Sequence, residues 1–140
     1  MRKRKSLIAI SAFLLLWTLH ARAGEPPERI VSLSPNLTHI IYALGGLDRV
    51  VGVTIFSDFP PEAGKIPKVG GWVNPNYETI VALKPDAVIL MKDQDIIFGQ
   101  KLRALGLNTI VTDSNDSVAD IMKTIPYLGE MLGREKEAET

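Results

Sequence analysis

Cysteine is absent from the 140 residues. Its absence excludes disulfide bonds, thiolate metal sites and covalently attached c-type haem, and it leaves no thiol to carry a lipid anchor. Histidine is nearly as scarce, since only His20 and His39 occur. Transition-metal sites usually draw several imidazole or thiolate ligands, so we expect no metal site in this protein.

An excess of basic residues is also missing, because 16 Lys and Arg balance 16 Asp and Glu. The basic residues are unevenly placed, however, and the first 23 positions hold five of them and no acidic residue. Residues 24–140 therefore carry 11 basic and 16 acidic residues, a net charge of −5 over 117 residues. An acidic body without a basic patch argues against a nucleic-acid partner.

The first 23 residues have the three-part layout of a secretory signal peptide. A basic cluster at 2–5 precedes an apolar run at 7–19, and Ala21-Arg22-Ala23 supplies the small-x-small cleavage pattern. The apolar run is shorter than the roughly 20 residues that a membrane span needs. We expect cleavage after Ala23 and export without a lipid anchor, which fits a Gram-negative periplasm best.

Residues 24–140 alternate between strand-like and helical patterns. Four apolar or β-branched runs predict strands at 29–33, 50–53, 87–91 and 108–112. Between and after them, helices are expected from Ser34-Pro35, from Asn74-Pro75, over 95–105 and over 117–137. This alternation predicts an α/β fold with a mostly parallel sheet flanked by helices. At 117 residues, the chain can bury one core.

The loops that follow the strands carry the candidate ligand-binding residues. Ligands of open α/β sheets bind beyond the carboxyl ends of the strands. Those ends carry Ser34-Pro35-Asn36, Phe56 and Met91, and a separate loop carries Trp72. Aromatic and apolar side chains with a few polar groups suit a large, partly apolar organic ligand.

Catalytic patterns are weak, and we expect no enzyme and no catalytic residue. Ser34, His39 and Asp58 could form a triad of a small secreted hydrolase, but Ser34 lies in no Gly-x-Ser-x-Gly elbow. The glycine pairs at 45–46 and 70–71 match no phosphate-binding loop. A metal-binding receptor that uses His39 is a further alternative.

Three segments resemble a known family: RIVSLSPNLTHIIYALG at 29–45, GVTIFSDFPP at 52–61 and VGGWVNPNYETIVALKPDAVIL at 69–90. They are similar to the periplasmic binding proteins of cobalamin and ferric-siderophore ABC importers, and most of all to the cobalamin binders. The resemblance implies two α/β lobes joined by a long helix, with the ligand between them. This chain would then comprise the signal peptide (1–23), the N-terminal lobe (24–116) and the start of the interlobe helix (117–140), without the second lobe.

The resemblance also implies a function. We expect a monomeric carrier that captures a corrinoid and delivers it to an ABC permease complex in the inner membrane, without a cofactor of its own. A ferric siderophore or haem is the alternative ligand within the family. One lobe would contact only one side of such a ligand, so the 140-residue chain should bind weakly.

Individual residues match positions of the family. Trp72 matches a tryptophan that contacts the corrin, Phe56 falls where the cobalamin binders have a tyrosine, and Met91 falls where they have a second tryptophan. Ser34-Pro35-Asn36 would add polar contacts from a helix N-terminus. Glu78 matches the acidic residue that docks on arginines of the permease.

Overall fold

The computed structural model describes residues 24–113 and 116–140, so the expected signal peptide lies outside the described residues. Its centre is a parallel sheet of four strands in the order β2-β1-β3-β4. The strands are β1 (Ile30–Ser32), β2 (Val50–Val53), β3 (Ala87–Met91) and β4 (Thr109–Thr112). They lie where the four apolar runs predicted them, and the predicted α/β class is confirmed.

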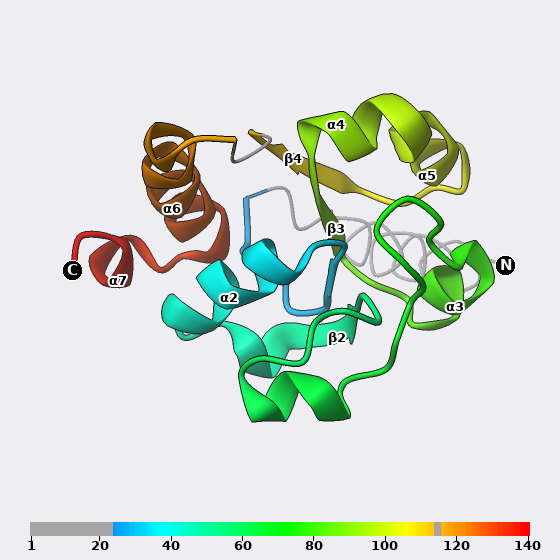
Figure 1. The fold of residues 1–140 in the computed structure, drawn as a ribbon, viewed down its shortest axis with the longest axis horizontal. Coiled ribbons are helices and arrows are strands. Elements are labelled where there is room, and N and C mark those ends of the chain that lie inside the picture. The colour runs from blue at the N-terminus through cyan, green and yellow to red at the C-terminus, as the bar shows by residue number, and fades with distance from the viewer. Residues whose placement is uncertain (1–23, 114–115) are drawn as a thin grey trace, which may run out of the picture.

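Helices cover both faces of the sheet (Figure 1). One face carries α2 (Pro35–Ala43) and α6 (Val118–Leu132), and the other carries α3 (Tyr77–Ala82) and the helical stretch after β3. That stretch consists of α4 (Lys92–Gln94), the π-helical η3 (Asp95–Gly99) and α5 (Gln100–Ala104). The remaining helical elements are η1 (Leu47–Arg49), η2 (Pro61–Lys65) and α7 (Glu135–Ala138). No helix in the described ranges is both long and apolar enough to cross a membrane.

Side-chain alternation along β3 builds a core on each side of the sheet. Ile89 and Met91 belong to the cluster that α2 and α6 cover, whereas Val88 and Leu90 belong to the opposite cluster. All five β3 residues are buried, as expected for a central strand of a parallel sheet. Burying each large aliphatic side chain contributes about 1.5–3 kcal/mol, so β3 is the main apolar support of the sheet.

The helix expected from Asn74-Pro75 begins later, at Tyr77, and the prediction of its start was wrong. Asn76 is the N-cap, and its side chain accepts a hydrogen bond from the Thr79 N–H at 3.0 Å. Pro75 instead pairs with Gly70 in an isolated antiparallel bridge. The Asn-Pro pair therefore closes a turn, which leaves Trp72 outside the helix.

The helical stretch after β3 begins at Lys92, three residues before the predicted start. The helical pattern at 95–105 predicts that Ile97, Leu102 and Leu105 face the core. The π-helical turn shifts the buried face, so Ile97 is 58% exposed and Leu105 is 46% exposed, whereas Leu102 is buried. Phe98 takes the inner position and packs in the same cluster as Leu102. A wide turn of this kind changes which residues face the sheet in a way that a regular 3.6-residue period does not anticipate.

The C-terminal helix is shorter than expected. Its N-cap is Ser117, the first residue of the expected range, but it ends at Leu132 rather than near Glu137, because Gly133 adopts a left-handed conformation with φ of 63°. The chain then turns into α7, and a Cβ added at Gly129 would lie 2.6 Å from the Ala138 Cβ. The helix expected over 117–137 is thus two helices in close contact. The assignment of this region to an interlobe helix stays a prediction.

Replacing Ser117 by alanine should destabilise the start of α6. The Ser117 hydroxyl accepts a hydrogen bond from the Asp120 N–H at 3.2 Å and donates one to Asp120 Oδ2 at 2.7 Å. We expect Ser117→Ala to lower the free energy of unfolding by about 1 kcal/mol. Ser117→Thr should keep most of the stability that the cap contributes. Urea unfolding followed by circular dichroism measures both.

The effect of Ser117→Ala should also depend on pH. The hydrogen bond from the Ser117 hydroxyl, with help from Lys123, holds the pKa of Asp120 below its usual 3.8. A carboxyl group whose pKa is lowered in the folded state adds stability above its unfolded pKa and loses it as the pH falls below that value. The difference in the free energy of unfolding between wild type and Ser117→Ala should therefore become smaller below pH 3.8. A constant difference across this range would contradict the expectation.

Candidate functional site

The strand order creates a switch point between β1 and β3. From β1 the chain crosses through α2 to β2 on one side, and from β3 it crosses through α4–α5 to β4 on the other side. The connections therefore diverge at the carboxyl ends of β1 and β3, and such a switch point is the usual ligand position in sheets of this kind. Ser34-Pro35-Asn36 follows β1, and Met91 ends β3.

The structure brings Asn36 and Met91 together at this switch point. Asn36 Nδ2 lies 3.5 Å from Met91 Sδ, although the two residues are 55 positions apart. Asn36 Oδ1 accepts hydrogen bonds from the Ser34 hydroxyl and from the Leu37 N–H. The carboxamide is thereby fixed in orientation, with its NH2 group next to the sulfur. Half-buried Asn36 thus presents hydrogen-bond donors beside an apolar side chain.

The hydroxyl of Ser34 is engaged by a neighbouring side chain. Ser34 occupies the N-cap position of α2, but its side chain makes no capping bond to the helix backbone. Its hydroxyl donates to Asn36 instead, and Asn36 contacts the Leu37 N–H. Ser34 is 2% exposed, so it orients Asn36 and offers little surface to a ligand.

Phe56 and Trp72 belong to two neighbouring loops. Phe56 is 58% exposed, and a Cβ added at Gly71, the residue before Trp72, would lie 3.8 Å from its ring. The Ile55 N–H donates to the Gly70 carbonyl at 3.0 Å, which joins the two loops. Trp72 is half-buried and packs against the cluster that contains Met91. The predicted aromatic residues thus lie on adjoining loops, one of which reaches the core beneath Met91.

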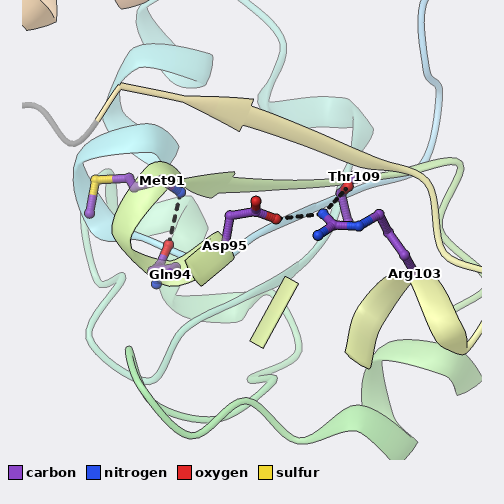
Figure 2. A network of polar contacts seen from close by, with 5 residues as sticks. All are labelled: Met91, Gln94, Asp95, Arg103 and Thr109. Carbon is purple, nitrogen blue, oxygen red and sulfur yellow. Dashed lines mark hydrogen bonds and ion pairs between the residues drawn. The ribbon is translucent and has the colours of Figure 1, made fainter. Parts of the chain in front are cut away.

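Gln94 is the site residue that sequence reasoning missed. It is fully buried, and its Oε1 accepts a hydrogen bond from the Met91 N–H at 3.1 Å (Figure 2). Its Nε2 donates to the Leu33 carbonyl at 2.7 Å and to the Trp72 carbonyl at 2.9 Å. A Gln at the third position of a helix that reaches back to the N-cap N–H is a known sequence signal. That signal went unused because the helix was expected to begin at residue 95.

A buried chain of hydroxyl groups links the loops that follow β1 and β2. Thr38 Oγ1 lies 2.8 Å from Ser32 Oγ and 3.5 Å from Ser57 Oγ, and Ser57 Oγ lies 3.0 Å from Thr54 Oγ1. Lys68 Nζ donates to the Ser57 carbonyl at 2.7 Å and to that of Ala63 at 3.3 Å. These contacts hold the loop that carries Phe56 against the first turn of α2.

Next to this surface, the structure has a hollow of about 560 Å³ at the carboxyl end of β4. Its lining includes Lys92, Asp95, Thr112, Lys123 and Tyr127. The Asp95 carboxylate pairs with Arg103, which also donates to Thr109 Oγ1 at 3.2 Å (Figure 2). The hollow therefore brings charged side chains of both signs to the sheet edge near Met91.

The arrangement does not support the hydrolase alternative. The Ser34 hydroxyl is engaged by Asn36, and within the described residues no hydrogen bond joins it to His39. His39 is exposed and lies edge-on to Phe59, with ring centroids 5.1 Å apart. Asp58 is exposed as well. Across 24–113 and 116–140, no three His, Asp or Glu side chains gather in a way that could hold a metal ion.

Comparison with known proteins identifies the family. Residues 30–140 match the family model described as periplasmic binding protein. The chain belongs to the periplasmic binding protein family. Over 120 residues it is also 38% identical to an uncharacterized ABC transporter substrate-binding lipoprotein of Bacillus subtilis, a match that covers 82% of this chain and 37% of the relative.

Solved structures of this family show the same fold. The periplasmic vitamin B12-binding protein of Vibrio cholerae superposes with a TM-score of 0.73 at 32% identity, over 81% of this chain and 45% of that one. A periplasmic haem-binding protein of Pseudomonas aeruginosa gives a TM-score of 0.74 at 28% identity, over 81% and 41%. The chain thus spans less than half the length of these two-lobed binding proteins, and it has the fold predicted for one lobe.

An ester-hydrolysis assay tests the discarded triad. We expect wild type and Ser34→Ala to release product from a p-nitrophenyl ester at the same background rate, because the Ser34 hydroxyl donates to Asn36. His39→Ala should leave that rate unchanged too. A tenfold or greater loss in Ser34→Ala, about 1.4 kcal/mol of transition-state stabilisation, would contradict a purely binding role.

Proposed function

We propose that this protein captures a corrinoid of the cobalamin type in the periplasm and delivers it to an ABC permease complex in the inner membrane. The observation that carries the proposal is the surface at the switch point. There Phe56 and Trp72 supply apolar contacts, and Asn36 supplies an amide donor at 3.5 Å from the sulfur of Met91. Met91 is 5% exposed and supports Asn36 from within the core. Membership in the periplasmic binding protein family supports a transport role and not an enzymatic one.

The chemistry of a corrinoid fits this surface. A corrin is a broad ring with apolar faces and with amide groups around its edge. The faces would pack on the exposed ring of Phe56 and on the half-buried Trp72. The edge carbonyls would accept hydrogen bonds from the Asn36 NH2 group, which its neighbours hold in one orientation. Vitamin B12 is also the ligand named for the Vibrio cholerae structure.

Charge favours a corrinoid over an anionic siderophore. The Lys68 ammonium group already donates to two backbone carbonyls, which leaves few of its donors for an anionic ligand. Lys92 is exposed at the edge of the site, beside a hollow whose lining carries as many acidic as basic side chains. Haem or a ferric siderophore is the alternative ligand. The similar fold of a haem-binding protein supports haem as one of these alternatives.

This chain would supply one wall of the site. The Vibrio cholerae protein is more than twice as long as the matched region, so the opposite wall in a two-lobed carrier lies outside residues 1–140. The carrier would act as a monomer without a resident cofactor. Export by the signal peptide, without a lipid anchor, is part of the proposal, although the Bacillus subtilis relative is named a lipoprotein.

Ligand titrations test the proposal. Once the signal peptide is removed, Trp72 is the single tryptophan of the chain, so its fluorescence reports directly on the site. We expect cyanocobalamin to quench it saturably, with a dissociation constant in the high-micromolar to millimolar range, because one lobe covers one face of the ligand. Calorimetry on the same samples separates binding from light absorption by the ligand.

Variants locate the binding surface. We expect Phe56→Ala to weaken cyanocobalamin binding about tenfold, equivalent to ~1.4 kcal/mol, through loss of an aromatic contact. Ile97→Ala, an equally exposed apolar residue on η3, is the matched control and should leave binding unchanged. Tighter binding of hemin or ferric enterobactin would overturn the corrinoid assignment. Saturable binding of none of the three would overturn the ligand-binding surface itself.

Glu78 would contact the permease. It is exposed in the first turn of α3, where its carboxylate is free of the contacts that build the switch point. We expect Glu78→Lys to reduce cobalamin uptake through the cognate permease at least tenfold, about 1.4 kcal/mol of docking energy, and to leave ligand binding unchanged. Glu62→Lys makes the same charge change on the exposed η2 and serves as the control. Equal uptake by both variants would contradict docking through Glu78.

A further inference from the structure

Gln94 joins three separate segments at the switch point. All of its polar atoms are used: Oε1 accepts from the Met91 N–H, and Nε2 donates to the Leu33 and Trp72 carbonyls. The side chain has no exposed surface. A buried carboxamide with three good bonds is a rigid cross-link, because breaking it would leave buried backbone groups unpaired.

This cross-link attaches the loop that carries Trp72 to the end of the sheet. The turn at 70–76 has other backbone hydrogen bonds, since the Gly71 N–H donates to Asn74 and the Gly70 carbonyl accepts from Ile55. Just before it, the Val69 N–H donates to the carbonyl of Val53 in β2 at 2.8 Å. The bond from Gln94 attaches the Trp72 backbone to the end of β1 and to the start of α4 (Figure 2 shows the contact to Met91).

We infer that Gln94 is a positioning residue that holds Trp72 in its ligand-binding position before any ligand arrives. This inference rests on the proposed function for the role of Trp72, but the placement of the indole is measurable without a ligand. Preorganisation of this kind strengthens binding because an ordered side chain loses less freedom when the complex forms. Gln94 itself does not need to touch the ligand.

Gln94→Glu separates the two ends of the cross-link. The variant keeps the size of the side chain and an oxygen that can accept from the Met91 N–H. It replaces the donor group with a carboxylate oxygen that faces the carbonyls of Leu33 and Trp72. Repulsion between these oxygens should release the Trp72 loop at neutral pH. Burial favours the neutral carboxylic acid, and this form can donate one hydrogen bond, so acidification should restore part of the contact.

The readout is the environment of Trp72 in the protein without its signal peptide. At neutral pH we expect Gln94→Glu to shift the tryptophan emission to longer wavelength and to weaken the near-ultraviolet circular dichroism signal. Both changes should partly reverse on acidification. Wild type and Gln100→Glu should not show this pattern. Gln100 is exposed on α5, so Gln100→Glu introduces the same charge away from the cross-link. Wild-type Trp72 spectra in folded Gln94→Glu that persist from neutral to mildly alkaline pH, where the buried carboxyl group ionises, would overturn the inference.

Two further measurements decide the matter if Gln94→Glu does not fold. Gln94→Met removes the three bonds without adding a charge and should also shift the Trp72 emission. In the wild-type protein, NMR should show slow hydrogen exchange of the Gln94 side-chain amide compared with that of Gln100. Exchange of Gln94 as fast as that of Gln100 would show that the cross-link does not form.

Ligand binding connects the cross-link to function. We expect Gln94→Glu to bind cyanocobalamin about three- to tenfold more weakly than Gln100→Glu at neutral pH. Shifted Trp72 spectra with unchanged affinity would overturn the role in ligand binding. If wild type binds no cyanocobalamin, the proposed function fails, whereas the spectral comparison still decides whether Gln94 positions Trp72.

Discussion

The parallel pairing of β1 with β3 is the constraint on which the rest of this structure depends. Ile30, Val31 and Ser32 pair in register with the first three residues of β3, although the strands are far apart in sequence. This pairing brings the loop after β1 next to Met91, at the point where the two connections diverge. The apolar residues of β3 hold the pairing in place because each face of the strand packs into its own core. The sheet topology therefore places the residues of the candidate site, and a few polar contacts fix their orientation.

The strands and the fold class could be predicted because the information is local. Continuous apolar runs bounded by turn residues predict buried parallel strands, and β3 has the predicted bounds. The residues at strand ends were also identifiable, since topology places them at one edge of the sheet. This is why Asn36 and Met91, predicted from separate parts of the sequence, lie within contact distance in the structure.

The contacts that organise the site could not be predicted in the same way. Gln94 bonds to carbonyls 61 and 22 residues away, and no periodic pattern encodes such pairs. The exposure of Ile97 and the burial of Phe98 depend on a π-helical turn, which a regular helical period does not describe. The turn at Gly133, in contrast, has a local signal in the sequence, because a glycine after an apolar helix is a recognised stop signal. The amphipathic pattern that continues beyond it obscured this signal.

The two bonds from the Lys68 ammonium group have a consequence for the way in which a ligand approaches. The two carbonyls use up donors of the ammonium group but do not cancel its charge, because a carbonyl is neutral. Lys68 would therefore attract anions toward this loop at long range and would have few donors left to hold them on arrival. The same side chain would thus affect the rate of encounter more than the strength of the final contact.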